Sequence, residues 1–206
     1  MNKYLLSFLL FFVISGVALA HQPRLVGDDL VIKVEDPEIS KAYYGTLKGE
    51  PAIYIIQSNE PFNFYLDLLV PDVEGVNKNV FLEVVGSNGW AWTSFASSLT
   101  WEKFHEPFTG DDYWVHKQLD RDAEAGTYTI TVYSSNNEDK YALAIGKTES
   151  FPLNEIWHTI KVLPELKTDF FEKSILTSYM NVIGLFMLAA IGFVALIIYG
   201  VKKLFF

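Results

Sequence analysis

His21 is the residue of this sequence with the most distinctive potential chemistry. Ala18-Leu19-Ala20 is a small-x-small pattern typical of signal-peptide cleavage, and cleavage there would make His21 the first residue of the mature chain. A terminal histidine offers its amine and a ring nitrogen to one metal ion. A second imidazole, from His105 or His116, would complete a T-shaped copper site. The candidate metal ligands are therefore His21, His105 and His116, in a copper carrier or an oxidative copper enzyme.

With this terminal histidine the sequence resembles lytic polysaccharide monooxygenases and the CopC-type copper-binding sandwiches. The resemblance implies copper bound through His21 and a second histidine ring. The sequence departs from both families at Gln22-Pro23, and it holds no recognisable second-histidine motif. The alternative is a polar terminus that binds no metal.

A second candidate site lies in an aromatic and acidic segment near the middle of the chain. Exposed aromatic rings flanked by carboxylates and amides are how sandwich lectins stack on sugar rings. The alternative is that these rings fill the core and that Gly110-Asp111-Asp112 is merely a turn. The candidate ligand-binding residues are Trp101, His105, Glu106, Asp111, Asp112, Tyr113 and Trp114.

Three acidic segments could hold a structural calcium ion, which takes about six to eight oxygen ligands. They are Asp111-Asp112, the run Asp120, Asp122 and Glu124, and residues 136–139, and none has EF-hand spacing. No Gly-x-Ser-x-Gly, His-Glu-x-x-His, P-loop or dinucleotide fingerprint occurs in the chain. The sequence therefore favours a binding role without catalysis.

Composition limits the partners further. The 206 residues include no cysteine, which excludes disulfides, thiolate metal sites and cysteine nucleophiles. Apart from Lys3, Lys202 and Lys203, the chain carries 13 basic and 25 acidic residues, a net charge of −12. An acidic surface repels phosphate backbones, so nucleic acid is not expected as a partner.

Both ends of the chain have membrane-related patterns. Residues 1–20 are predicted to be a secretory signal peptide. No charged residue lies between Lys173 and Lys202, and residues 179–201 are predicted to cross the lipid bilayer as one helix. Basic residues follow at once in the tail 202–206, which the positive-inside rule places in the cytoplasm. The N-terminal domain is then outside, in a periplasm or at the cell surface, on a single-pass membrane protein.

The segment 21–151 alternates β-rich runs with turn residues, which predicts a mainly β domain, an antiparallel sandwich of jelly-roll type. The clearest strand is 126–133, where Tyr128, Ile130 and Val132 alternate with threonines. Residues 140–145 are predicted to return beside it and complete a hairpin. Further strands are predicted at 30–34, 52–57, 62–70 and 80–85.

A helical pattern follows Gly146. Asn154 is the predicted helix N-cap, apolar residues follow at helical spacing, and Pro164 is predicted to end the helix. Residues 152–178 are therefore predicted to form either a helical stalk or a helix packed on the domain, leading into the membrane.

The segments Asp36–Gly45, Phe104–Phe108 and Lys140–Gly146 resemble an uncharacterised group of membrane-anchored bacterial and archaeal proteins. The Gly-x-Tyr-x-Ile-x-Val pattern that begins at Gly126 is similar to the last strands of pre-peptidase C-terminal domains. That resemblance implies a non-catalytic β-sandwich. The expected function is a membrane-anchored binding module that recognises an envelope or surface component, such as a carbohydrate, or a membrane-protein partner.

Overall fold

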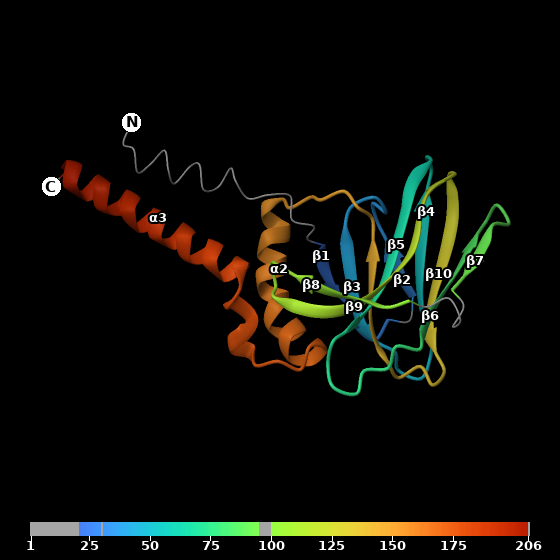
Figure 1. The fold of residues 1–206 in the computed structure, drawn as a ribbon. Coiled ribbons are helices and arrows are strands. Elements are labelled where there is room, and N and C mark those ends of the chain that lie inside the picture. The colour runs from blue at the N-terminus through green and yellow to red at the C-terminus, as the bar shows by residue number, and fades with distance from the viewer. Residues whose placement is uncertain (1–20, 30, 95–99, 206) are drawn as a thin grey trace.

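The computed structural model of the protein describes residues 21–29, 31–94 and 100–205. The predicted signal peptide lies outside these residues. Two β-sheets pack face to face, a helical segment covers the outer face of one of them, and a long helix leaves the domain beside that segment (Figure 1). The predicted mainly β sandwich with a C-terminal apolar helix is confirmed.

The strand order defines two sheets. The larger sheet runs in the order β1 (Gln22–Leu25), β3 (Lys41–Thr46), β11 (Lys140–Ile145), β5 (Phe62–Pro71), β9 (Asp111–Ala123) and β8 (Glu102–Glu106). The smaller sheet runs β2 (Val31–Val34), β4 (Ala52–Ser58), β10 (Gly126–Ser134), β6 (Val80–Gly86) and β7 (Ala91–Thr93). The pairs β1–β3 and β2–β4 are parallel, and the other pairings between these strands are antiparallel.

Period-two alternation builds the core between the sheets. Every second residue of β4, β6 and β10 is buried, including the fully buried Ile56, Val84 and Ile130. The hydroxyl groups of Tyr54 and Tyr141 lie 2.8 Å apart across the core, so each buried hydroxyl has a hydrogen-bond partner.

The predicted hairpin of residues 126–133 and 140–145 is wrong, although both strands exist. β10 lies between β4 and β6 in the smaller sheet, whereas β11 lies between β3 and β5 in the larger one. The connection between them therefore crosses from one sheet to the other. The physical reason is burial: β10 alternates between buried and partly exposed residues, but β11 is buried on both of its faces.

The second face of β11 is covered by the segment before the long C-terminal helix. This segment comprises α2 (Leu153–Glu165), a π-helical turn η2 (Leu166–Phe170) and a 3₁₀ turn η3 (Ile175–Tyr179). It packs as a helix on the domain, one of the two arrangements predicted for 152–178. The buried residues of this second apolar cluster are Leu69, Tyr113, Ala142, Ala144, Leu166, Phe170 and Phe171.

Pro164 does not end α2 as predicted, and Asn154 lies inside the helix rather than at its N-cap, which is Pro152. A proline removes the N–H that would bond the carbonyl four residues earlier, here that of Ile160. The hydroxyl of Tyr179 donates to this carbonyl instead, at 2.7 Å. This hydrogen bond links η3 to α2. The chain continues past the proline into the π-helical turn.

The long helix α3 (Val182–Phe205) begins three residues later than predicted. Asn181 is its N-cap, because the side-chain oxygen of Asn181 accepts from the backbone N–H of Gly184 at 3.2 Å. A Cβ at Gly184 would lie 1.7 Å from the carbonyl oxygen of Tyr179, so only glycine allows this close turn. Residues 182–203 are long and apolar enough to cross a membrane.

Candidate functional site

The predicted aromatic and acidic site lies on the antiparallel strands β8 and β9, and the pleat of β9 divides it between two faces. Asp111 and Tyr113 face the helical segment, where both are buried. The side chains of Trp114 and His116 lie on the opposite face, toward the space between the sheets. The structure therefore does not gather the predicted residues around one ligand position.

Asp111 is an architectural residue in this structure. Its carboxylate is fully buried and forms ion pairs with Lys167 Nζ at 2.6 Å and Lys173 Nζ at 2.9 Å. Lys167 is itself 1% exposed and donates also to the Thr109 carbonyl at 2.6 Å. That carbonyl accepts from the Asn181 side chain at 3.0 Å as well, so the β8–β9 turn holds both η2 and the start of α3.

The remaining predicted residues have structural partners. The Trp114 ring lies under the ammonium of Lys78, 3.2 Å from the ring centroid, and its Nε1 donates to Asp72 at 2.8 Å. Trp101 packs against the core and the His116 ring. His105 and Asp112 form an exposed pair at 2.8 Å.

Glu106 and Tyr113 are both buried, and the pKa of each is raised. Burial raises the pKa of the Glu106 carboxyl, and the nearby Asp111 carboxylate raises it further. The backbone N–H of Phe108 donates to that carboxyl at 2.9 Å and partly offsets the effect. Burial also raises the pKa of Tyr113 well above its usual value, and its hydroxyl lies 3.0 Å from that of Tyr44.

The histidines required for the two-ring copper site lie far apart. His21 precedes β1 at one edge of the larger sheet, His116 is on β9 and His105 on β8 at the opposite edge. At about 4.8 Å per strand, β1 is about 19 Å from β9 and about 24 Å from β8. The structure does not form the predicted pairing of His21 with either ring.

The acidic segments considered for calcium do not converge either. Asp111 is held by two lysines, and Asp120 by Lys147 at 2.7 Å. The side-chain oxygen of Asn137 accepts a hydrogen bond from the backbone N–H of Ser134 at 2.9 Å, within the same turn. Within residues 21–29, 31–94 and 100–205, no three histidine, aspartate or glutamate side chains gather closely enough to hold a metal ion.

His21 gives a pH-dependent prediction. Its Nδ1 lies 2.5 Å from the Ser40 hydroxyl, and burial lowers its pKa to about 4. Between pH 6.5 and about 4 the unfolded chain binds a proton that the folded chain does not, so stability falls as the pH falls. Between pH 7.5 and 5, we expect the free energy of unfolding of the wild-type chain to fall by up to about 2 kcal/mol more than that of His21→Gln.

Urea unfolding of the full chain in detergent micelles at the two pH values measures this difference. His105→Gln is the matched control, since it makes the same substitution at an exposed histidine. An identical pH dependence in wild type and His21→Gln would contradict the prediction. Contributions of groups that neither histidine influences are common to the three proteins and cancel in the comparison.

A cleft of about 600 Å³ opens at the edge of the sandwich where β1 and β2 lie. These are the outermost strands of the two sheets, so the cleft is the open end of the space between them. Residues of β3 form its inner side, and Pro152 and Glu155 at the start of α2 close one end. The charged and amide side chains that line it are Gln22, Arg24, Asp29, Lys33, Glu35, Asp36, Lys41 and Glu155.

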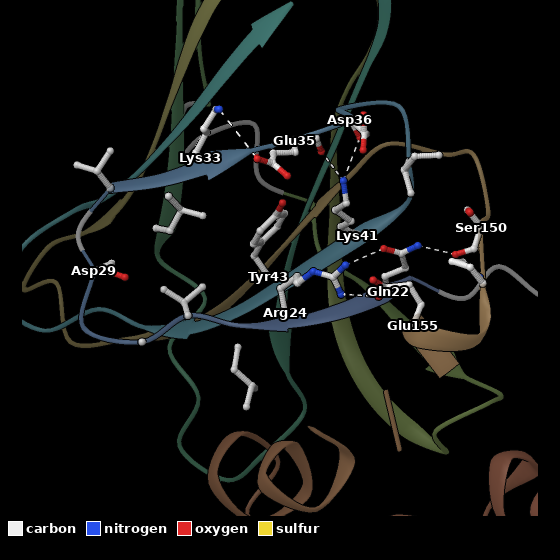
Figure 2. A pocket seen from close by; sticks show the side chains of 17 residues that line it. Gln22, Arg24, Asp29, Lys33, Glu35, Asp36, Lys41, Tyr43, Ser150 and Glu155 are labelled. Carbon is white, nitrogen blue, oxygen red and sulfur yellow. Dashed lines mark hydrogen bonds and ion pairs between the residues drawn. The ribbon is translucent and has the colours of Figure 1, made fainter. Parts of the chain in front are cut away.

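Arg24 connects the cleft to α2. Figure 2 shows its guanidinium between the side chains of Gln22 and Glu155. The ion pair with Glu155 measures 2.9 Å, and Arg24 donates to the Gln22 side-chain oxygen at 2.8 Å. Gln22 in turn donates to the Ser150 carbonyl at 2.5 Å. These bonds fix the guanidinium in place at this end of the cleft.

Lys41 is the most unusual group in the cleft. Its side chain is buried, and its ammonium donates to the main-chain carbonyls of Glu35 and Asp36 (Figure 2). Arg24 and Lys33 each form an ion pair, but Lys41 forms none with the residues that the structure describes. Burial is the main cause that lowers the pKa of Lys41, and the Asp36 carboxylate opposes it.

Tyr43 follows on the same face of β3 and also lines the cleft (Figure 2). Burial raises its pKa to about 12, so the hydroxyl stays protonated at neutral pH and can donate a hydrogen bond. An ammonium has three donors, and Lys41 uses two of them on carbonyls. The cleft therefore combines fixed donors with the carboxylate acceptors of Glu35 and Asp36.

Sequence reasoning missed this cleft, because neither β1 nor β3 was predicted. The available signal was the alternation Lys41-x-Tyr43 opposite Gln22-x-Arg24, which places polar groups on the core-facing side of paired strands. Polar residues at core-facing positions are uncommon and point to a special environment. That signal becomes visible only when the register of β1 against β3 is known.

No protein-family model and no curated protein matches this chain. Solved structures with some similarity include the pre-peptidase C-terminal domain of a collagenase from Bacillus anthracis, with 12% identity, 61% of this chain and 95% of that chain covered, and a TM-score of 0.31. A β-glucosidase from Paenibacillus barengoltzii is similar over 61% of this chain and 13% of its own, with 13% identity and a TM-score of 0.27. The first of these structures is a pre-peptidase C-terminal domain, the family to which the strand at Gly126 has a loose resemblance.

Proposed function

We propose that this chain is a membrane-anchored, non-catalytic binding module that recognises a polar component of the cell envelope or surface through the cleft between β1 and β2. The observation that carries the proposal is the buried ammonium of Lys41, which lines the cleft without an ion-pair partner among the described residues. A buried charge is costly unless it is paired, so such a group is expected to have a functional partner.

An acidic carbohydrate fits this cleft best. Its carboxylate would accept from Lys41 and Tyr43, and its hydroxyl groups would donate to the carboxylates of Glu35 and Asp36. Charge-assisted hydrogen bonds of this kind give orientation as well as affinity. A protein partner is the other class of ligand expected from the sequence, and titration with saccharides separates the two.

The proposed location is the outer side of the cell membrane. Residues 182–203 have the length and hydropathy of a membrane-spanning helix, and Lys202 and Lys203 stand at its end. By the positive-inside rule this end faces the cytoplasm, so the sandwich and its cleft face outward.

The test is calorimetric titration of the full chain in detergent micelles with trigalacturonate, a trisaccharide of uronates, and with neutral maltotriose. We expect trigalacturonate to bind with a dissociation constant on the order of 1 mM, equal to about 4 kcal/mol, and maltotriose to bind less tightly. Lys41→Gln removes the buried charge and should weaken trigalacturonate binding about tenfold or more.

Lys33→Gln is the matched control, because Lys33 lines the same cleft but is exposed and already lies 4.0 Å from Glu35. Its effect on the dissociation constant should stay below about twofold. Equal binding of both saccharides, or equal weakening by the two substitutions, would contradict recognition through Lys41. Absence of binding to either saccharide would contradict the carbohydrate ligand and leave a protein partner as the ligand to test.

A further inference from the structure

α2 has an apolar face that the domain does not cover. Leu153, Ile156 and Trp157 are 77%, 42% and 63% exposed. Their spacing of three and four residues places them on one side of the helix, and Ile160 continues that side. Exposed apolar side chains that gather in this way mark an interaction surface.

The rest of α2 is not exposed in this way. Leu163, three residues after Ile160, continues the apolar side at the end of the helix and is fully buried there, and Glu155 pairs with Arg24. Asn154 and Lys161 lie on a third, polar side of the helix and are exposed. The part of the apolar face that precedes Leu163 is therefore exposed, and it is distinct from the polar side.

This apolar face is continuous with the start of the membrane helix. Tyr179 of η3 binds the Ile160 carbonyl, so η3 lies beside the apolar face of α2. Leu176 and Met180 are 75% and 81% exposed, and α3 begins two residues after Met180. Figure 1 shows α3 leaving the molecule on the side where α2 lies.

Hydrogen bonds fix this arrangement. The Asn181 side chain, at the start of α3, donates to the Thr109 carbonyl, and Lys167 and Lys173 hold the preceding segment to Asp111. The close approach of Gly184 to Tyr179 ties η3 to the first turn of α3. A bilayer crossed by α3 must therefore come close to α2 and η3.

We propose that α2 and η3 lie in the interfacial layer of the bilayer that α3 crosses. Their apolar side chains enter the lipid, while Asn154 and Lys161 face water. Tryptophan and tyrosine are enriched at the level of lipid headgroups, which agrees with Trp157 and Tyr179 at this position. The inference rests on the proposed membrane anchor and adds a second, fixed contact with the membrane.

This contact determines where the cleft lies. Pro152 and Glu155, which close one end of the cleft, belong to the first turn and N-cap of α2. With α2 in the interfacial layer, that end of the cleft lies beside the membrane surface. The ligand is then one that is presented close to the bilayer rather than far from it.

The absence of cysteine allows a direct test by single-cysteine spin labelling. Leu153→Cys and Trp157→Cys report the apolar face, and Asn154→Cys and Lys161→Cys are matched controls on the polar side of the same helix. Each full chain carries one nitroxide and is placed at one copy per phosphatidylcholine nanodisc. The measurement is the accessibility of the nitroxide to oxygen, which concentrates in lipid, relative to a water-soluble nickel chelate.

We expect this ratio to be at least about threefold higher at positions 153 and 157 than at 154 and 161. Leu188→Cys in α3 tests the anchor separately, and Glu83→Cys on β6 provides the value for water. An accessibility ratio typical of lipid at position 188, together with ratios typical of water at positions 153 and 157, would overturn the inference and leave the anchor intact. A water value at 188 would overturn the anchor itself, and labels at 153 and 157 shielded from both reagents would show a protein contact instead of lipid.

Discussion

Asp111→Asn is expected to lower the free energy of unfolding of the full chain by about 3–5 kcal/mol, because it leaves a buried ammonium without its counter-charge. Lys167 is 1% exposed, and Asp111 carries the carboxylate that balances it. Burial already lowers the pKa of Lys167, and the Asp111 carboxylate opposes that shift. Removal of the carboxylate therefore also favours release of the Lys167 proton.

Urea unfolding in detergent micelles measures the loss, and hydrogen exchange shows where it acts. The amides of η2 should exchange faster in the variant, since the ion pairs that hold this turn to β9 are gone. Asp112→Asn is the control: it makes the same chemical change at the next residue, where the carboxylate is exposed and pairs with His105. We expect a loss below about 1 kcal/mol there. Equal losses in the two variants would show that burial of the Asp111 pair does not matter to stability.

Ile130→Asp is expected to unfold the sandwich. Ile130 is fully buried at the centre of β10, between Tyr54 of β4 and Val84 of β6. The substitution removes apolar contacts worth about 2–5 kcal/mol and buries a carboxyl that has no partner. The sum approaches the whole stability of an average domain, about 5–15 kcal/mol.

Far-UV circular dichroism should show loss of the β signal in Ile130→Asp at room temperature. Thr129→Asp places the same side chain one position earlier, on the outer face of the same strand, where Thr129 is partly exposed. This control should keep the β signal and lose at most about 1 kcal/mol, through a lower strand preference. A folded Ile130→Asp protein would contradict the assignment of that face to the core.

Local patterns in the sequence were sufficient for several elements. The runs predicted at residues 52–57, 62–70 and 80–85 are strands β4, β5 and β6 with at most one residue of difference at either end. The strict alternation of residue types identified the core face of β10, because a period of two residues is typical of a strand with one buried side. The apolar run after Asn181 identified α3, because bilayer thickness sets the length of a spanning helix.

The elements that were missed have weaker local signals. β3, β8 and β9 carry charged and polar residues among their aromatic ones, and β1 is a four-residue strand that contains a proline, so no period stands out. Pro164 was expected to end a helix, but the helix continues past it, and the hydroxyl of Tyr179 donates to the Ile160 carbonyl that the proline cannot bond. The sequence around Pro164 does not reveal this distant hydrogen-bond partner.

The sequence by itself determined the class of fold, the alternating core strands and the apolar C-terminal helix, because each depends on the spacing of side chains along a few neighbouring residues. Only the tertiary structure decided that β10 and β11 belong to different sheets and that Asp111 serves the ion pairs with Lys167 and Lys173. It also decided that Gln22, Arg24, Lys41 and Tyr43 line one cleft. These facts depend on strand order and register, which are set by how buried faces match across the whole domain.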